Sequence, residues 1–363
     1  MIVHGGDVWQ VAEEFGIPAS GILDFSANIN PRGLPPQALQ RLQREASGPQ
    51  SLSCYPDPSA RRLRQALREQ LAVPAEAIAV GAGAEALLDP ILRCLRPQRV
   101  LVPIPAFSEY RRVCERLQAE FVPFPLDRAE LFRVPVDRLC RRMESEECDV
   151  VLLNNPHNPS GALLDRDEIL PILDAAQSRG GTLLMDEAFI DYSPHDSLVG
   201  EAARRPGSIV LRSLTKFYGC PALRVGYVVA PPDTIERIRS LVATWPVTQL
   251  ALDTLSEAVA DNAYAAASLR DNGAERERLG SSLASLGISV FPPAANYLLL
   301  ELRADMPSAS ELRRRLIVKH RILIRNCDSY EGLTPGRYVR VAVRSNEENH
   351  RLIEAMAGEL SCL

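Results

Sequence analysis

Short apolar runs alternate with amphipathic stretches of helical length through the first 260 residues of the chain. The apolar runs cover Ile78–Gly81, Val100–Pro103, Val150–Asn154, Thr182–Asp186, Ile209–Ser213 and Val225–Ala230. Helical patterns between them include Ala60–Leu71, Glu85–Leu95, Glu109–Gln118 and Asp167–Ser178. Apolar runs without strict alternation are typical of strands buried on both faces, and helices between them connect parallel strands. The pattern therefore predicts an α/β fold with a mainly parallel sheet.

The pattern changes near Asp261, where a long charged helical stretch begins and extends to Leu286. Strand-like runs follow at Asn296–Leu302, Arg321–Arg325 and Tyr338–Val343, with helical patterns at Ser308–Val318 and Glu347–Leu360. Two helices against a few strands predict a smaller α+β domain. We expect an N-terminal arm at 1–35, a large domain at 36–260 and a small domain at 261–363. The arm contains one short helix and a Pro/Gly-rich turn, and it could pack on either domain.

Length and composition fit a two-domain enzyme. The chain has 363 residues, of which 46% are hydrophobic and 24% charged, as in ordinary globular proteins. A formal charge of -5 and scattered Lys and Arg residues argue against a nucleic-acid partner. No apolar stretch is long enough for a membrane span and the N-terminus has no signal-peptide pattern, so we expect a cytoplasmic protein. The eight cysteines form no C-x-x-C pair and no zinc-finger spacing, which predicts free thiols and no metal site.

Polar motifs follow the apolar runs, at the strand ends where ligands of parallel sheets bind. Lys216 comes directly after the run that ends at Ser213. A desolvated amine has a lowered pKa and readily forms a Schiff base. The hydroxyls of Ser213 and Thr215, with Arg224 further on, suit a phosphate group. Taken alone, however, a lysine after a strand is usually a surface residue.

Two further strand ends carry polar groups. Asp186 closes one run, and its carboxylate could bond to a pyridinium nitrogen and keep it protonated. A metal ligand or a helix N-cap is the common alternative for such an aspartate. The segment Asn154–Gly161 closes another run, and its two prolines make a rigid turn that could aim the Asn158 amide at a ring oxygen. A simple tight loop is the alternative there.

The order and separations of Asn158, Asp186, Lys216 and Arg224 resemble the fold-type I pyridoxal-phosphate family, the aspartate-aminotransferase superfamily, over essentially the whole chain. The cofactor implied is pyridoxal 5'-phosphate. In that family the lysine carries the cofactor, the aspartate meets N1, the asparagine meets the 3'-oxygen and the arginine binds phosphate. The resemblance implies these roles here, with Lys216 and Asp186 as the catalytic residues.

The resemblance extends to other cofactor-binding positions. Gly83, Ala84 and Glu85 look like the glycine-rich turn whose amides hold the phosphate at a helix N-terminus. Phe107 matches the aromatic residue that stacks on the pyridine ring, although a core phenylalanine is the ordinary alternative. Tyr55 matches a tyrosine that reaches the neighbouring subunit's cofactor phosphate. The family therefore implies a homodimer with a shared active site.

The two ends of the chain resemble the threonine-phosphate decarboxylase branch of this superfamily, which serves cobalamin biosynthesis. The likeness begins in residues 4–7 and 23–31, continues in residues 186–191 and 211–218, and extends to residues 295–300, 321–325 and 338–345. Phe189 stands where many aminotransferases have tyrosine, which removes a donor to the ring oxygen and favours a reaction other than transamination. Residues 245–248 depart from the branch's pattern, so the fine fit of the substrate stays open.

The expected reaction is decarboxylation of O-phospho-L-threonine to (R)-1-aminopropan-2-ol phosphate. A histidinol-phosphate-type aminotransferase and a decarboxylase of phosphoserine are the alternatives. A catalytically silent binding protein of this fold is less favoured, because such proteins usually lose the lysine or the aspartate. Sequence leaves open which of the candidate groups binds phosphate.

A substrate with a carboxylate and a phosphate requires fixed cations and amide donors. Arg340 resembles the superfamily arginine that binds the α-carboxylate. We expect substrate contacts from His4, Gly5, Asn28, Asn158, Arg325 and Arg340. An N-terminal histidine is most often just solvated, and Arg325 could instead form a surface ion pair.

Overall fold

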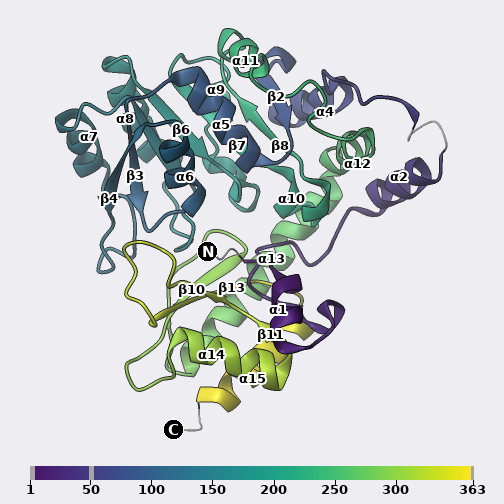
Figure 1. The fold of residues 1–363 in the computed structure, drawn as a ribbon, viewed down its shortest axis with the longest axis vertical. Coiled ribbons are helices and arrows are strands. Elements are labelled where there is room, and N and C mark those ends of the chain that lie inside the picture. Colours follow the sequence, from purple (N-terminus) through teal and green to yellow (C-terminus); the bar gives the residue numbers. More distant parts are fainter. Residues whose placement is uncertain (1–4, 49–52, 361–363) are drawn as a thin grey trace.

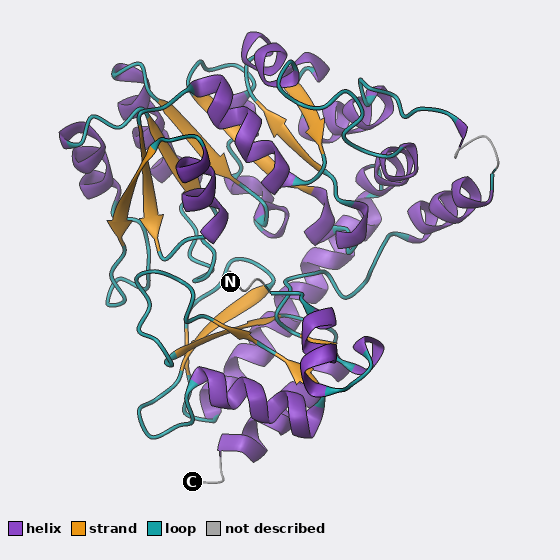
Figure 2. Cartoon of the chain, viewed as in Figure 1, coloured by secondary structure: helices purple, strands orange, loops and turns teal. Residues whose placement is uncertain are grey.

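The computed structural model describes residues 5–48 and 53–360, and in these the larger sheet has seven strands (Figures 1 and 2). Across the sheet they are β2 (Ile78–Gly81), β8 (Gly226–Val229), β7 (Ser208–Ser213), β6 (Thr182–Asp186), β5 (Val150–Asn154), β3 (Arg99–Ile104) and β4 (Glu120–Pro125). β8 is antiparallel to both β2 and β7, and the other neighbours are parallel. The predicted mainly parallel α/β fold is confirmed.

Helices cover both faces of this sheet. One face packs against α5 (Ala84–Leu95), α6 (Ser108–Arg116) and α11 (Pro232–Arg239). The other packs against α4 (Arg61–Leu71), α7 (Val136–Ser145), α8 (Arg166–Ser178), α9 (Val199–Ala202) and α12 (Gln249–Val259). Within β6, Leu184 joins the first core while Leu183 and Met185 join the second. Successive side chains of a strand point to opposite faces, so strands buried on both sides must be apolar throughout.

The edge strand β4 was not predicted. Pro123 and Pro125 lie within it, and its side chains alternate between buried and more exposed positions. Proline lacks a backbone N–H and is tolerated at a sheet edge, where one side of the strand has no partner. Because of the two prolines, the sequence pattern does not predict this strand, which is recognised from its parallel pairing with β3.

A second, antiparallel sheet holds four strands in the described part of the chain: β12 (Arg325–Asn326), β13 (Tyr338–Ala342), β10 (Tyr297–Glu301) and β9 (Ser289–Val290). It packs with α13 (Asn262–Ser285), α14 (Ala309–Arg315), a π turn at Leu316–His320 and α15 (Asn346–Leu360). Figure 1 shows α13 running from the larger sheet's side to this smaller one. The predicted domain boundary near residue 260 falls between α12 and α13 and stays a prediction.

The N-terminal residues pack beside the smaller sheet. α1 (Val8–Phe15) shares a small core with Ile317 and Leu323. β1 (Leu23–Asp24) pairs with β11 (Ile322–Leu323), which splits the single strand predicted at 321–325 into β11 and β12. Further along, Asn30 Nδ2 donates at 2.8 Å to the carbonyl of Phe217, which follows β7 of the larger sheet. The segment after β1 thus crosses from one sheet to the other.

The remaining short elements are η1 (Ala19–Gly21), α2 (Pro36–Ser47), η2 (Ala75–Ala77), η3 (Ile190–Tyr192), η4 (Pro194–Asp196), α10 (Leu214–Phe217) and η5 (Pro221–Leu223). Of the helices in the described ranges, none combines the length and the apolar character that crossing a membrane requires.

Candidate active site

A cavity of about 730 Å³ lies at the carboxyl ends of β5, β6 and β7. Asn154, Asp186 and Ser213 are the last residues of these three strands, and all three line the cavity. Arg325 and Arg340 from the smaller sheet close it on the other side. Because parallel strands end at one edge of the sheet, residues far apart in sequence meet in this single space.

Lys216 and Asp186 both line this cavity. Lys216 lies in the one-turn helix α10 directly after β7, and its Nζ stands 5.6 Å from the centre of the Phe189 ring. Asp186 is buried, and its Oδ2 accepts a hydrogen bond from the Tyr110 hydroxyl at 2.7 Å. Its Oδ1 accepts the backbone N–H of Ala188 at 2.9 Å. Both carboxylate oxygens are therefore held in fixed directions.

Burial shifts the pKa of both groups. It lowers the pKa of Lys216, an effect that the Asp186 carboxylate opposes and the Arg224 and Arg340 guanidinium groups reinforce. Burial also raises the pKa of Asp186, against the hydrogen bonds from Tyr110 and Ala188 and the charge of Lys216. A lowered pKa leaves more of the lysine as the neutral amine, which is the nucleophilic form.

Asn158 and Arg340 are joined although they lie 182 residues apart. Arg340 Nη1 donates to Asn158 Oδ1, which also accepts the Tyr330 hydroxyl at 3.1 Å. Arg340 Nη2 donates to the Ser26 carbonyl at 3.0 Å, and the side chain is buried. Arg340 Nη1 also donates to the Tyr330 hydroxyl at 3.1 Å, so three groups hold this guanidinium as a fixed cation for a carboxylate.

The turn between β2 and α5 fits a phosphate group. Gly83 has φ +97°, and a Cβ added there would lie 2.8 Å from Nη2 of Arg224. Ala84 and Glu85 begin α5 and line the cavity. Since the first amides of a helix lack intrahelical partners, this turn offers N–H donors beside a guanidinium.

The side chains of the Ser213–Lys216 motif complete that end of the cavity. The Ser213 and Thr215 hydroxyls bond to each other at 2.9 Å, and both residues line the cavity. Phe107 also lines it, with its ring 5.6 Å from the ring of Tyr110 in an edge-to-face arrangement. An amine, a carboxylate, an aromatic face and a phosphate cradle together fit pyridoxal phosphate.

The opposite end of the cavity carries more polar groups. Arg325 Nη2 donates to the Ser329 hydroxyl at 2.7 Å, and both residues line the cavity. Asn28 is buried in the wall, and in the described structure its Oδ1 has no hydrogen-bond partner. Gly5 also lines this end; a Cβ there would lie 2.1 Å from the Ser26 carbonyl oxygen. A buried amide oxygen without a partner indicates a place for a bound polar group.

Two predicted residues lie elsewhere. Tyr55 is 79% exposed, stacks on Trp245 at 4.4 Å and is not part of the cavity wall of its own chain. This placement leaves the prediction that it serves a neighbouring subunit's site untested. His4 lies outside the described residues, so its predicted substrate contact is also untested.

Sequence reasoning missed several wall residues, including Tyr110, Ser26, Ser329, Tyr330 and Arg344. Tyr110 follows Phe107 by three residues in a helical pattern, and that spacing places both on one face. The others face the cavity only because the smaller sheet and the N-terminal segment fold against it. Within the described ranges, no group of three or more His, Cys, Asp or Glu side chains is arranged to hold a metal ion.

Comparisons with known proteins agree with this geometry. The profile of the family described as "Aminotransferase class I and II" matches residues 20–356. The chain is 36% identical to the threonine-phosphate decarboxylase of Salmonella typhimurium, over 99% of this chain and 96% of that protein. It is 32% identical to the histidinol-phosphate aminotransferase of Roseiflexus castenholzii, over 95% and 92%. The crystal structure of L-threonine-O-3-phosphate decarboxylase from Porphyromonas gingivalis has a TM-score of 0.81 at 26% identity, over 93% of this chain and 99% of that one.

Proposed function

This chain belongs to the class I and II aminotransferase family, and on that basis we propose that it is a decarboxylase of a phosphorylated amino acid. The substrate is O-phospho-L-threonine, and the product is (R)-1-aminopropan-2-ol phosphate, a component of cobalamin biosynthesis. The observation that carries this proposal is the full-length likeness to a threonine-phosphate decarboxylase. The cofactor is pyridoxal 5'-phosphate, on which this family depends.

The cavity's fixed cations suit such a substrate. Arg340 binds the α-carboxylate, because its guanidinium is held by Asn158 and by the Ser26 carbonyl. Arg325 and Asn28 bind the phosphate at the far end, where the Arg325 guanidinium and the Asn28 Nδ2 amide donate to the phosphate oxygens. Gly5 lines the same end, and a substrate contact from His4 stays a prediction from the sequence. Two anionic groups bound at separate points fix the rotation about the bonds of Cα.

Pyridoxal phosphate, when bound, would supply an electron sink for the bond at Cα that is to be broken. Decarboxylation breaks the Cα–carboxylate bond, leaves its electron pair on Cα and releases carbon dioxide; a proton then takes the vacant position. Asp186 would accept the N–H of the protonated ring, Asn158 would bond to the ring oxygen, and Arg224 with the Gly83 turn would hold the phosphate. Phe107 would cover one face of the ring and exclude water from it.

Lys216 is the only lysine placed to carry the cofactor. The chain contains two lysines, Lys216 and Lys319. Lys319 has its ammonium 2.9 Å from Glu359 and does not line the cavity. Phe189 lies beside Lys216 and has no hydroxyl group to offer the ring oxygen or a passing proton. This supports an anchoring lysine in a reaction that does not remove the Cα proton.

A covalent-trapping experiment tests the cofactor assignment. Borohydride treatment of the holoenzyme should fix one cofactor mass on the peptide that contains Lys216. Lys216→Ala should lose the label, the visible absorbance and all turnover, because the amine that bonds the cofactor is gone. Lys319→Arg is the matched control and should keep all three. A label that survives in Lys216→Ala would overturn the assignment.

The finer elements of the proposal concern assembly and location. We place the enzyme in the cytoplasm as a homodimer in which Tyr55 reaches the cofactor phosphate of the neighbouring subunit. The exposed stack of Tyr55 on Trp245 supports this role, because a large aromatic surface at the outside of a chain favours contact with another chain.

Histidinol-phosphate transamination is the second candidate, because a relative of that activity is 32% identical over nearly the full chain. Its amine substrate also carries a phosphate but has no α-carboxylate. Phosphoserine is a third substrate to compare, since it differs from phosphothreonine by one methyl group. The three candidates differ in the products that they release.

A product screen separates them. The holoenzyme is incubated with phosphothreonine, phosphoserine or threonine, and with histidinol phosphate plus a keto acid, while carbon dioxide and amine products are measured. We expect carbon dioxide and aminopropanol phosphate in equal amounts from phosphothreonine, with threonine a poor substrate. Keto-acid-dependent consumption of histidinol phosphate, without carbon dioxide from any phospho-amino acid, would refute the proposal.

A further inference from the structure

The segment Asp24–Asn28 forms the wall of the cavity at its polar end, yet it has little secondary structure of its own. Its strand β1 contains only Leu23 and Asp24, each paired with one residue of β11. Asp24, Ser26 and Asn28 all line the cavity. A two-residue strand cannot hold a wall in place by its own ladder, so its position depends on other contacts.

Those contacts come from the end of β13 and the residues after it. Arg340 Nη2 donates to the Ser26 carbonyl at 3.0 Å, and the Ala342 N–H donates to the Phe25 carbonyl at 2.8 Å. Arg344 Nη1 donates to the Asp24 carbonyl at 3.1 Å, and its guanidinium lies 5.8 Å from the Phe25 ring. The carbonyls of three successive wall residues, 24 to 26, are thus each bonded by one of three alternate residues, 344, 342 and 340.

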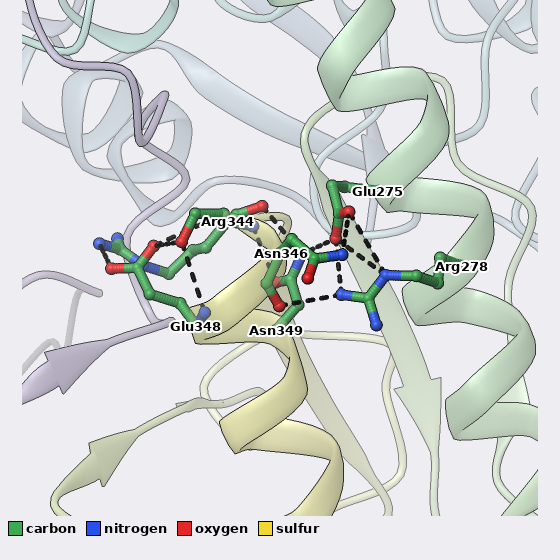
Figure 3. Close-up of polar contacts among 7 residues, drawn as sticks. Glu275, Arg278, Arg344, Asn346, Glu348 and Asn349 are labelled. Atoms are coloured by element: carbon green, nitrogen blue, oxygen red, sulfur yellow. Dashed lines mark hydrogen bonds and ion pairs between the residues drawn. The ribbon is translucent and has the colours of Figure 1, made fainter.

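Arg344 is itself anchored from behind (Figure 3). Its Nη2 donates to Glu348 at 2.7 Å, and its backbone N–H and carbonyl are both bonded by the Asn349 side chain, at 3.0 and 2.8 Å. Asn349 also donates to Glu275 of α13 at 2.9 Å. The guanidinium therefore has a fixed position, and its side chain is only 20% exposed at the cavity wall.

We propose that Arg344 is a specificity-determining residue that positions the wall Asp24–Asn28 for the substrate's phosphate. This rests on the proposed function, in which the substrate carries a phosphate there. Arg344 acts through the wall, because its guanidinium is bonded to the Asp24 carbonyl and to Glu348. Its loss weakens recognition of the phosphate and leaves the chemical step intact.

The test compares two substitutions of Arg344 with a matched control. Arg344→Met removes the charge and the bond to Asp24, while Arg344→Lys keeps the charge but can satisfy fewer partners. Arg278→Gln breaks the ion pair with Glu275 at the other end of the Figure 3 network, and Arg278 does not line the cavity. Each holoenzyme is titrated with phosphothreonine, threonine and inorganic phosphate, with cofactor absorbance and turnover as readouts.

Arg344→Met should raise the dissociation constant and the KM for phosphothreonine by about tenfold or more, as expected on loss of a charged hydrogen bond. Binding of inorganic phosphate should weaken as well, while threonine binding and kcat should stay within about threefold of the original enzyme. Arg344→Lys should recover part of the affinity. Arg278→Gln should keep the affinity even if it lowers the melting temperature.

Equal weakening for phosphothreonine and threonine, or a lower kcat at unchanged KM, would overturn the inference. A failure of the Arg344 inference can be distinguished from a failure of the decarboxylase proposal. If the original enzyme releases no carbon dioxide from phosphothreonine, the decarboxylase proposal fails, but the titrations still compare a phosphorylated with an unphosphorylated ligand. A preference for the phosphorylated ligand that survives in Arg344→Met would then count against Arg344.

Discussion

The Tyr110 hydroxyl favours the ionised form of the Asp186 carboxylate. Burial alone raises the pKa of Asp186, and the Tyr110 hydroxyl bond at 2.7 Å opposes that shift. Burial also raises the pKa of Tyr110 well above its ordinary value, so the hydroxyl stays a donor. A hydrogen bond donated to an ionised carboxylate favours the ionised form. Asp186 must be ionised to accept the proton-bearing nitrogen of a pyridinium ring.

Replacing Tyr110 with Phe should therefore raise the pKa of Asp186. The acid limb of the pH–activity profile should move to higher pH by about one unit. A hydrogen bond to a charged group contributes about 1.5 kcal/mol, and a pKa shift of one unit corresponds to about 1.4 kcal/mol. The profile of kcat/KM against pH in holoenzyme measures this. Tyr338→Phe is the control, because its hydroxyl donates to Glu301 at 3.1 Å away from the cavity. An unmoved acid limb in Tyr110→Phe would show that Asp186 is not the titrating group.

At the residue scale, the sequence indicated the cofactor's cavity better than the residues that support it. Lys216, Asp186 and Asn158 stand out because each is a polar group after an apolar run. Tyr110 is 76 residues from Asp186, and Tyr330 is 172 residues from Asn158. No local pattern reports a hydrogen bond between such distant residues, which forms only once the sheet and the smaller domain assemble.

At the element scale, strands buried on both faces were easy to predict and marginal strands were not. β5 and β6 match their apolar runs residue for residue, because both sides of each strand pack on helices. β4 was not predicted because it contains two prolines. β11 and β12 were predicted as one strand, since they are adjacent in sequence and differ only in pairing with β1 and β13 respectively. Pairing partners are a property of the assembled sheet and have no signature in a two-residue strand.

The loop after β5 is held by a buried histidine. His157 Nε2 lies 2.8 Å from the Pro105 carbonyl, which can only accept, so Nε2 carries the proton. Nδ1 then accepts from the Ser160 hydroxyl at 2.7 Å. The neutral ring thus joins the Asn158 loop to the turn that carries Phe107. Burial lowers the pKa of His157 to about 4, against the opposing effect of the Pro105 bond.

This shift predicts a pH-dependent stability. The unfolded chain protonates this histidine near its ordinary pKa of about 6.5, so the unfolded state gains protons first as the pH falls. The stabilisation that comes from the neutral His157 is fully present above about pH 6.5, the pKa in the unfolded chain, and is lost as the pH falls toward 4. Between pH 7 and pH 5 this single group should lower the free energy of unfolding by about 2 kcal/mol. His157→Gln should lose this part of the pH dependence, as measured by urea unfolding at both pH values.

His195→Gln serves as the control for that measurement, because His195 is exposed on a short turn. It should leave the stability difference between pH 7 and pH 5 unchanged. If His157→Gln and the original protein lost equal stability on acidification, the buried ring would have no part in the effect.

At the scale of the whole molecule, one cavity is built from three separate parts of the chain. The larger sheet supplies Lys216 and Asp186, the smaller sheet supplies Arg325 and Arg340, and the N-terminal segment supplies Asn28. The first set holds the cofactor and the other two grip the substrate in the proposed function. Changes in substrate preference should therefore arise from the smaller sheet and the N-terminal segment, while the end with Lys216 and Asp186 stays the same.

Tyr55 should add a fourth part, from a second copy of the chain. Mixing the inactive Lys216→Ala protein with a Tyr55→Ala protein, after dissociation and reassembly, makes half of the dimers mixed. In a mixed dimer, the chain that keeps Lys216 receives Tyr55 from its partner and has a complete site. Activity should then rise to about one quarter of the original enzyme, since one site in two is complete in half of the dimers. If Tyr55 served the site of its own chain, no complete site would form, and the mixture would show only the residual activity of Tyr55→Ala.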